Sequence, residues 1–145
     1  MKKLLFIIAG FFLFSCGRQD PSEALKNING YWQIDHVQIQ KDSVIKYGFS
    51  QYIDYIKLSD STGFRKKLEP DFSGKFRTTQ NAEKIKPVIE DDKLFLHYST
   101  PYDQWKEEVL EADEDELILK NRDGKIYYYK RYQPISLEEH EAKKE

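Results

Sequence analysis

Candidate nucleophiles and bases lie close together in one polar stretch, His97 to Asp103. Ser99 and Thr100 carry hydroxyls that could attack a carbonyl if a histidine accepted their proton, and Asp103 could orient such a histidine. The spacing argues against this chemistry, because His97 and Ser99 are two residues apart on an extended strand and would point to one face without touching. The Gly-x-Ser-x-Gly turn that presents a nucleophilic serine is also missing from the sequence. We therefore expect no enzymatic activity, and instead a loop serine and a half-buried strand histidine.

Metal coordination is the second chemistry to consider, and the sequence gives little support for it. The histidines His36, His97 and His140 are far apart and show none of the short spacings that place two imidazoles on one metal. The acidic run Asp113-Glu114-Asp115-Glu116 could attract Ca2+, but it lacks the glycine and the alternating ligands of a calcium-binding loop. We expect no metal site and no cofactor, and we predict that the acidic run is a solvated turn between two strands.

The N-terminus carries the clearest functional signal in the chain. Lys2 and Lys3 precede an apolar segment, Leu4 to Phe14, which is the arrangement of a secretory signal. As a helix this segment would rise only about 16 Å, whereas a membrane span needs about 20 residues, so we exclude a transmembrane anchor. Cys16 follows almost directly and is the only cysteine of the 145 residues, which excludes a disulfide within the chain.

Leu13, Ser15 and Cys16 resemble a bacterial lipobox, in which a small residue precedes a cysteine that is lipidated and becomes the new N-terminus. The resemblance implies a signal peptide over residues 1–15, Cys16 as the lipid attachment site, and about three acyl chains such as palmitate, enough for stable membrane anchoring. Gly17 in place of an aspartate favours the outer membrane and leaves the periplasmic and surface faces open. A plain secretory signal with an incidental cysteine is the alternative. Residues 16–24 would form the lipidated end and a polar tether without fixed structure.

Composition limits the class of the mature domain. The sequence has 23 Lys and Arg; without Lys2 and Lys3 this leaves 21 against 25 Asp and Glu, a net charge of about −4. This balance predicts no nucleic-acid partner. Ten Tyr, nine Phe and two Trp suit half-buried strands, whereas a single Met and few Ala argue against a helical bundle. The 130 residues that follow residue 15 are enough for one domain with its own core.

Short alternating segments separated by turn residues run through this domain. They are residues 31–39, 44–47, 51–58, 64–68, 74–79, 84–89, 93–98, 104–111, 116–120 and 125–132. On the first segment, alternation predicts that Trp32, Ile34 and His36 share one face. Pro87 places its segment at an edge or a bulge, because proline donates no ladder hydrogen bond.

Asp123-Gly124 between the last two segments is typical of a tight hairpin turn with glycine at positive φ. Eight to ten strands joined by tight turns predict an all-β domain, an antiparallel up-and-down meander that closes into a small barrel and so removes exposed sheet edges. An open meander would leave two such edges, and a Greek-key sandwich would need longer connections. We assign residues 25–133 to the barrel, with one helical turn at its start, and residues 134–145 to a charged tail that could begin a short helix at Ser136.

Gly30 and Trp32 resemble the Gly-x-Trp signature that opens lipocalins, and Arg131 lies where that family keeps a basic residue over the tryptophan. Segments within residues 89–117 and 129–131 also resemble small lipocalin-like lipoproteins of Bacteroidetes. The resemblance implies a structural closure in which Arg131 stacks on the Trp32 ring and bonds to backbone carbonyls. The alternative for these two residues is a core aromatic and an unrelated surface cation.

A membrane-anchored lipocalin-like lipoprotein implies binding of a small apolar or amphipathic ligand, with tyrosine hydroxyls orienting it in an interior lined by aromatic side chains. The sequence does not identify the ligand-binding residues. The alternative is an envelope structural or interaction lipoprotein whose barrel is filled by its own aromatic side chains and whose surface contacts a protein partner. A barrel of eight strands is just wide enough for either, so the side chains in the interior decide between them.

Overall fold

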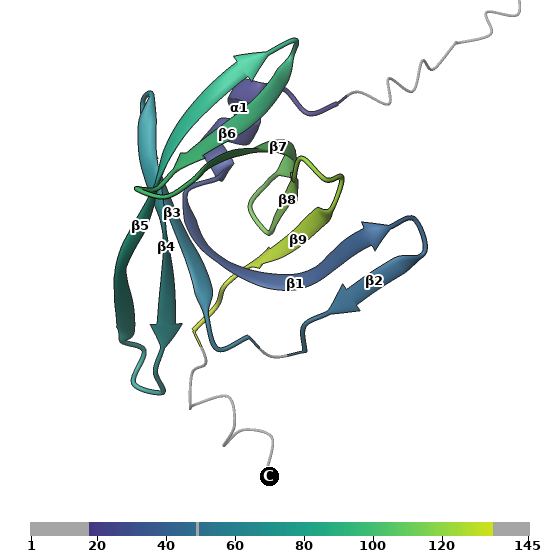
Figure 1. Ribbon diagram of the computed structural model, residues 1–145. Coiled ribbons are helices and arrows are strands. Elements are labelled where there is room, and N and C mark those ends of the chain that lie inside the picture. The colour runs from purple at the N-terminus through teal and green to yellow at the C-terminus, as the bar shows by residue number, and fades with distance from the viewer. Residues whose placement is uncertain (1–17, 49, 135–145) are drawn as a thin grey trace, which may run out of the picture.

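The computed structural model describes residues 18–48 and 50–134, which form a β-barrel with one short helix at one end (Figure 1). Cys16, the signal segment before it, and the tail from residue 135 onward, with Ser136 and His140, lie outside the described residues. No helix among the described residues is long and apolar enough to cross a membrane.

The barrel is built from antiparallel strands that follow one another around the ring. They are β1 (Gly30–Gln40), β2 (Ser43–Lys46), β3 (Ile53–Ser59), β4 (Thr62–Pro70), β5 (Phe76–Glu90), β6 (Lys93–Ser99), β7 (Gln104–Ala112), β8 (Glu116–Lys120) and β9 (Ile126–Arg131). Each strand from β3 to β8 pairs with the next in sequence, and β1 pairs with both β3 and β9. Eight strands therefore close the ring, and β2 is an extra strand paired with β1. The predicted all-β antiparallel up-and-down barrel is confirmed.

A β-bulge in β1 changes which side chains face the interior. Trp32 and Val37 are both buried although they are five residues apart, an odd number that would put them on opposite faces of a regular strand. The register of β1 against β9 shifts between Ile34 and His36, and an extra residue in one strand reverses the alternation beyond it. The prediction that His36 shares the face of Trp32 is therefore wrong. His36 stacks instead on Tyr128, with ring centroids 4.1 Å apart.

β5 is a single strand of 15 residues, although the sequence predicted two separate segments there. Its register against β4 shifts between Lys66 and Leu68, where β5 accommodates extra residues in the middle of its length. Pairing with β4 resumes on both sides of the bulge, and backbone hydrogen bonds form whatever the side chains are, so the polar composition of this stretch did not end the strand.

Pro87 lies in the part of β5 that has run past β4. It pairs with Leu96 of β6, whereas the last residue of β5 in register with β4 is Ile85. The strand is locally an edge at this point, as predicted, and the missing amide of proline interrupts no pairing with β4.

Helix α1 (Pro21–Asn27) packs against β6 and β7 at one end of the barrel. Asp20 is its N-cap, and the Asp20 side chain accepts backbone N–H groups of the first turn. Gln19 is fixed to the barrel, because its amide donates to the Ala112 carbonyl at 2.7 Å and accepts from the Ala112 N–H at 2.8 Å. The prediction of an unstructured tether is therefore wrong from Gln19 onward, since these polar side chains find backbone partners on the barrel and the helix.

The half of the barrel next to α1, which we call the closed end, is filled with side chains. Its fully buried residues are Ile28, Trp32, Ile56, Leu94, Leu96, Leu117 and Leu119. Burial of these large apolar groups supplies the main driving force for folding, at about 1.5–3 kcal/mol for each side chain. We call the opposite half of the barrel the open end.

Several aromatic residues pack on the outer surface instead of lining the interior. Tyr31 stacks on Tyr55 and on Phe76, with ring centroids 4.7 and 5.1 Å apart. Phe64 and Tyr132 contact this stack edge-on. The expectation that aromatic residues mainly line the interior is therefore wrong for this group, because alternation along β1 places Tyr31 opposite to its buried neighbour. The aromatic residues whose strand register faces inward above the closed end are Tyr98, Trp105, Tyr127 and Tyr129.

The hairpin between β8 and β9 has the predicted turn. Gly124 adopts a positive φ of 82°. The Asn121 side chain accepts hydrogen bonds from the backbone N–H groups of Asp123 and Lys125 at 3.0 and 2.9 Å, which closes the loop. The prediction of glycine at positive φ in this turn is confirmed.

Candidate functional site

Trp32 lies at the centre of the closed end. Its indole is fully buried, and Nε1 donates a hydrogen bond to the carbonyl of Ile28 at 2.7 Å. Strand pairing places Trp32 opposite Arg131 of β9. The guanidinium carbon of Arg131 lies 3.7 Å from the centroid of the indole ring, which is the geometry of a cation–π contact.

Arg131 also joins backbone segments that are far apart in the sequence. Its guanidinium donates hydrogen bonds of 2.7–3.0 Å to the carbonyls of Asn27, Asn29, Asp113 and Glu114. The planar fork of arginine is suited to such a set of acceptors. Burial lowers the pKa of Arg131, while nearby acidic side chains act in the opposite direction. The acidic run at residues 113–116 therefore has a structural role, because two of its backbone carbonyls accept hydrogen bonds from Arg131.

Gly30 makes room for this arrangement. Its φ of +132° is a conformation that side-chain-bearing residues rarely adopt. A β-carbon at this position would collide with Nη1 of Arg131. Gly30, Trp32 and Arg131 thus act together as a structural closure of the barrel.

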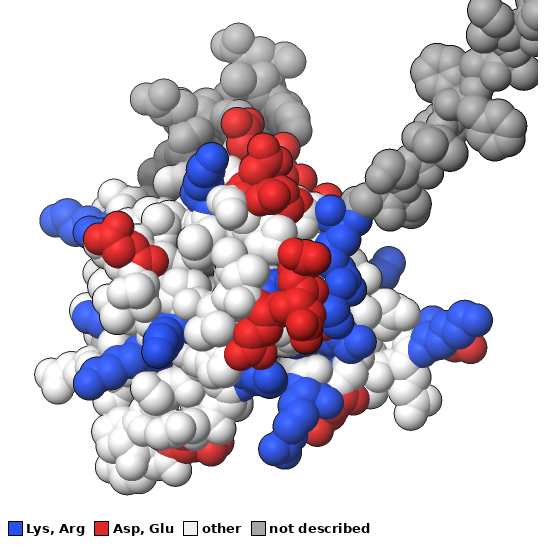
Figure 2. Space-filling model, turned by 90° about the horizontal axis from the view of Figure 1, so that it is seen from above, with Lys and Arg blue, Asp and Glu red and all other residues white. Residues whose placement is uncertain are grey.

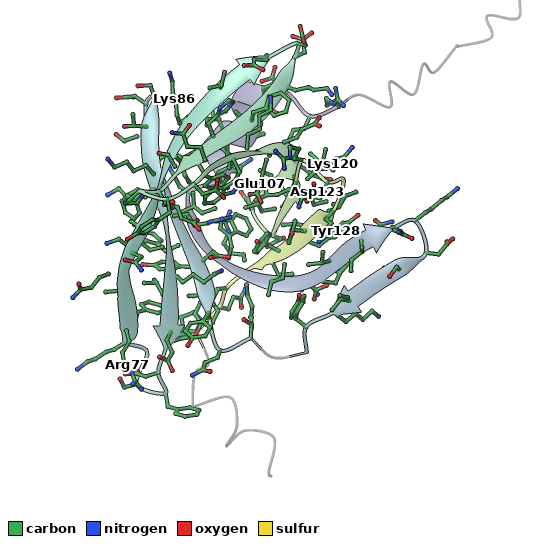
Figure 3. All side chains as sticks on the ribbon, in the orientation of Figure 1. Arg77, Lys86, Glu107, Lys120, Asp123 and Tyr128 are labelled. Atoms are coloured by element: carbon green, nitrogen blue, oxygen red, sulfur yellow. The ribbon has the colours of Figure 1, made fainter. Side chains whose placement is uncertain are left out.

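The open half of the barrel contains charged side chains that point inward. We call this group the interior polar cluster; it consists of Asp54, Arg65, Lys67, Glu83, Tyr98 and Glu107. Strand register pairs Arg65 with the buried Ile56 and with Glu83, and it pairs Glu107 with the buried Leu96, so these residues share the inner face. Figure 3 shows Glu107 directed toward the middle of the barrel.

Arg65 is the central member of the interior polar cluster. Its Nε donates to the carboxylate of Glu83, and its Nη1 lies 3.5 Å from the carboxylate of Glu107. The guanidinium carbon lies 4.3 Å from the centroid of the Tyr98 ring. Asp54 is paired separately, since it accepts a hydrogen bond from Lys67 at 2.7 Å. Two cations therefore face three carboxylates, and Glu107 has the longest contact of the three.

Burial alters the ionisation of this cluster. Desolvation raises the pKa of Glu107, against the opposing effect of Arg65. Desolvation also raises the pKa of Tyr98 well above its ordinary value, so the phenol keeps its proton at neutral pH. For Arg65, burial acts to lower the pKa, but Tyr98, Glu107 and Glu83 outweigh it and the pKa lies well above its ordinary value. The cluster therefore presents a permanent cation beside a carboxyl group whose pKa is raised.

The Tyr98 hydroxyl is buried and has no hydrogen-bond partner among the described residues. Glu107 lies close enough for its charge and a weak hydrogen-bonding contact to affect the pKa of Tyr98, but the contact falls short of a regular hydrogen bond. Leaving a buried hydroxyl unpaired costs about 1–3 kcal/mol. Such a group is a donor and acceptor that a bound molecule could satisfy.

Two clefts at the open end reach the interior polar cluster. One has a volume of about 650 Å3, is lined by Arg65, Lys67 and Glu83, and also includes Tyr102. The other has a volume of about 330 Å3 and is lined by Glu107 together with Trp105, Tyr127 and the β8–β9 turn. Both volumes lie within the range of small-molecule pockets, about 300–1,000 Å3. The open half therefore offers space beside polar groups, in contrast to the filled closed end.

The residues that the sequence analysis considered for catalysis do not form a catalytic site. His97 pairs with Lys86 on the outer face of the sheet, opposite to the interior polar cluster. The Thr100 hydroxyl accepts the N–H of Asp103 at 3.0 Å and so stabilises the β6–β7 turn. His36 contacts Asp35 at 2.7 Å. Within residues 18–48 and 50–134, no group of three or more His, Cys, Asp or Glu is placed to hold a metal ion.

Arg65, Glu83 and Glu107 were not predicted from the sequence as site residues. A signal existed for Glu107, because it alternates with Trp105 and Val109 on one predicted strand face, and a carboxylate on an apolar face is unusual. Arg65 and Glu83 gave no such signal, since their segments contain too few apolar residues to show which face is inward.

Comparison with known protein families gives a match over most of the barrel. A family model described as a lipocalin-like domain matches residues 28–119. One similar solved structure is a lipocalin-like protein from Bacteroides uniformis, with 9% sequence identity and a TM-score of 0.46; the match covers 73% of this chain and 99% of that chain. Another is an uncharacterized protein from Bacteroides eggerthii, with 14% identity and a TM-score of 0.45; the match covers 72% of this chain and 98% of that chain. Lobster apocrustacyanin A1 is a third, with 12% identity and a TM-score of 0.48; the match covers 85% of this chain and 72% of that chain. No curated protein sequence matches the chain. Because the family model covers more than half of the chain, this protein belongs to the family of lipocalin-like domains.

Proposed function

We propose that the protein is an outer-membrane lipoprotein, anchored through Cys16, which binds a small amphipathic molecule in the open half of its barrel and catalyses no reaction. The lipocalin-like barrel supports small-ligand binding in general. The observation that carries the proposal is the interior polar cluster, which lies beside two clefts of about 650 and 330 Å3. A purely structural barrel would gain stability by replacing such a cluster with apolar side chains.

The cluster also indicates the chemistry of the ligand. Arg65 is already neutralised by Glu83, and three carboxylates face two cations, so an anionic head group would be repelled. Glu107 and the unpaired Tyr98 hydroxyl can both accept a hydrogen bond. The ligand we propose therefore carries an amine or hydroxyl at its polar end and an apolar body toward Trp105 and Tyr127.

The test is a titration of the full-length protein in phosphatidylcholine nanodiscs with octylamine and with octanoate, followed by tryptophan fluorescence. We expect saturable binding of octylamine and at least about tenfold weaker binding of octanoate, because one charge-assisted hydrogen bond is worth about 1.5–3 kcal/mol. Empty nanodiscs provide the baseline for partition into lipid.

Glu107→Gln and Glu108→Gln form a matched pair for this titration. Both remove one carboxylate, but Glu108 pairs with Lys93 and Arg18 on the outer face. We expect a loss of octylamine affinity in the Glu107 variant alone. Equal affinities in the two variants, or preferred binding of octanoate, would contradict the proposed ligand class.

A second candidate function rests on the outer aromatic stack. Tyr31, Tyr55 and Phe76 form a continuous stacked surface outside the barrel. Aromatic side chains are enriched at protein interfaces, so this surface favours contact with an envelope protein. Crosslinking in intact cells through a photoreactive residue at Tyr31 would test it, with Lys41, in a distant turn, as the control position.

A further inference from the structure

A groove on the outer face of the sheet lies opposite to the interior polar cluster. Its volume is about 830 Å3, and its lining comes from β4 to β7 and the β8–β9 turn. We call it the basic groove, because its basic lining residues are Lys84, Lys86, His97, Lys106 and Arg122.

Strand register places these side chains on one face. Lys86, His97 and Lys106 form one direct cross-strand row over β5, β6 and β7. Lys84 lies two residues from Lys86 on β5 and so shares its face. The intervening positions, such as Tyr98, point into the barrel. Figure 3 shows Lys86 on the outer side of β5, away from Glu107.

Strand alternation separates charges that look balanced in the sequence. Glu83 and Lys84 are neighbours, and so are Lys106 and Glu107. In both pairs the glutamate belongs to the interior polar cluster and the lysine lines the basic groove. The fold therefore sends carboxylates inward and leaves their neutralising partners on the outer face.

The basic groove consequently has uncompensated positive charge. Lys84, Lys86 and Lys106 are exposed and, within the part of the chain that the structure describes, show no ion pair, and no Asp or Glu lines the groove. The face seen in Figure 2 differs, because acidic and basic side chains lie among each other there. Such a cluster of positive charges is unexpected on a protein with a negative net charge, and it attracts anions.

His97 adds a directional group to this groove. Its Nε2 atom is buried and has no hydrogen-bond partner among the described residues, although the histidine lies between Lys86 and Lys106. A buried ring nitrogen without a partner is costly, and an anion held by the two lysines could satisfy it.

We propose that the basic groove binds a small phosphorylated molecule with at least two phosphate groups. The backbone positions of Lys84 and Lys86 are about 7 Å apart along the strand, and those of Lys86 and Lys106 about 10 Å apart across it. These spacings suit several anionic groups rather than one. Lysine binds phosphate as a point charge, and Arg122 adds a planar donor pair at the edge of the groove. The basic groove shares Trp105, Lys106 and Arg122 with the smaller of the two clefts. Its basic side chains lie on the other face of the sheet from Glu107, so anion binding here does not depend on the function proposed for the interior polar cluster.

Isothermal titration calorimetry of the full-length protein in phosphatidylcholine nanodiscs tests the site with sodium tripolyphosphate and with orthophosphate. We expect saturable binding of tripolyphosphate that weakens with added NaCl, and weaker binding of orthophosphate. The double variant Lys84→Gln/Lys86→Gln should lose at least about tenfold in affinity, because each lysine contributes a charge-assisted contact. Both lysines are exposed, so the barrel should remain folded.

The matched control is Lys41→Gln/Lys75→Gln, which changes the net charge equally at exposed turn positions outside the groove. It should retain affinity within about twofold of the unmodified protein. His97→Phe, which removes the ring nitrogen, should weaken tripolyphosphate binding about tenfold and should not lower the thermal midpoint, because this nitrogen has no partner among the described residues of the free protein. Absence of tripolyphosphate binding, or equal losses in the two double variants, would overturn the proposal. Binding to vesicles that contain phosphatidylglycerol without binding to tripolyphosphate would also overturn it, in favour of a membrane contact.

Discussion

Arg131 covers the indole of Trp32 at 3.7 Å and thereby joins the last strand of the barrel to the first. The same guanidinium donates to backbone carbonyls at the end of α1 and in the β7–β8 turn. One side chain thus connects the helix, the closing strand pair and a distant hairpin. Its loss would release several backbone groups at once.

Trp32→Ala should lower the free energy of unfolding by about 3–5 kcal/mol, because it empties the largest fully buried site at the closed end. Urea unfolding followed by circular dichroism measures this loss. Arg131→Lys keeps the charge but cannot reach the same set of carbonyls, and we expect it to cost about 1–3 kcal/mol. A loss below about 1 kcal/mol for Trp32→Ala would show that the indole is not part of the core.

Gly30→Ala should destabilise the protein by about 1–3 kcal/mol, since alanine is strained at a φ of +132° and its β-carbon would collide with Arg131. Gly48→Ala is the control, because a β-carbon at Gly48 meets no atom of the described residues within 4 Å. It should stay within about 0.5 kcal/mol of the unmodified protein in the same urea titration. Equal effects of the two substitutions would argue against close packing at Gly30.

Tyr98→Phe should stabilise the ligand-free protein by about 1 kcal/mol, because it removes a buried hydroxyl that has no partner among the described residues. The same substitution should weaken octylamine binding, since the hydroxyl is one of the two acceptors assigned to the ligand. Urea unfolding and the fluorescence titration measure the two effects separately. Destabilisation by more than about 1 kcal/mol would indicate that the hydroxyl is already satisfied in the free protein.

Glu107 should make the protein less stable as the pH rises through its pKa. Desolvation raises the pKa of Glu107 in the folded state above its ordinary value of 4.5, so the folded state binds this proton more tightly than the unfolded state. The contribution of Glu107 to stability is therefore fully present below the unfolded pKa and is lost as the pH rises through the folded pKa. Glu107→Gln should remove this part of the pH dependence, and Glu108→Gln should keep it. Urea unfolding at a series of pH values checks the difference; parallel curves for the unmodified protein and Glu107→Gln would contradict it.

Cys16 should be the modified N-terminus of the mature protein. Mass spectrometry of the N-terminal peptide from native membranes should find Cys16 with a lipid on sulfur and an acyl group on its amine. Cys16→Ser should prevent lipidation and release the protein from the membrane fraction, because the acyl chains supply the membrane affinity. A mature N-terminus at another residue, or an unmodified Cys16, would contradict the anchored state.

Much of the closed end could be predicted from the sequence. Gly30, Trp32 and Arg131 carry a family resemblance, and the alternating segments with turn residues indicated an antiparallel barrel. The Asp123-Gly124 turn followed from local conformational preference alone. Such features depend on residues close in the chain or on a signature of a few residue types, so no knowledge of long-range contacts is needed.

The two proposed binding sites depended on the tertiary structure. Alternation shows that Lys106 and Glu107 point to opposite faces, but it does not show which face is inside until the sheet closes. The bulge in β1 likewise turns Val37 to the interior, because one extra residue in a strand reverses the face to which every later side chain points. Sequence patterns alone predicted the class of fold, and they alone carry the prediction of an export signal. The closure of the ring determined that Glu107 lies beside Arg65 in the interior and that Lys86 and Lys106 flank His97 outside, since these contacts join strands whose register only the folded sheet defines.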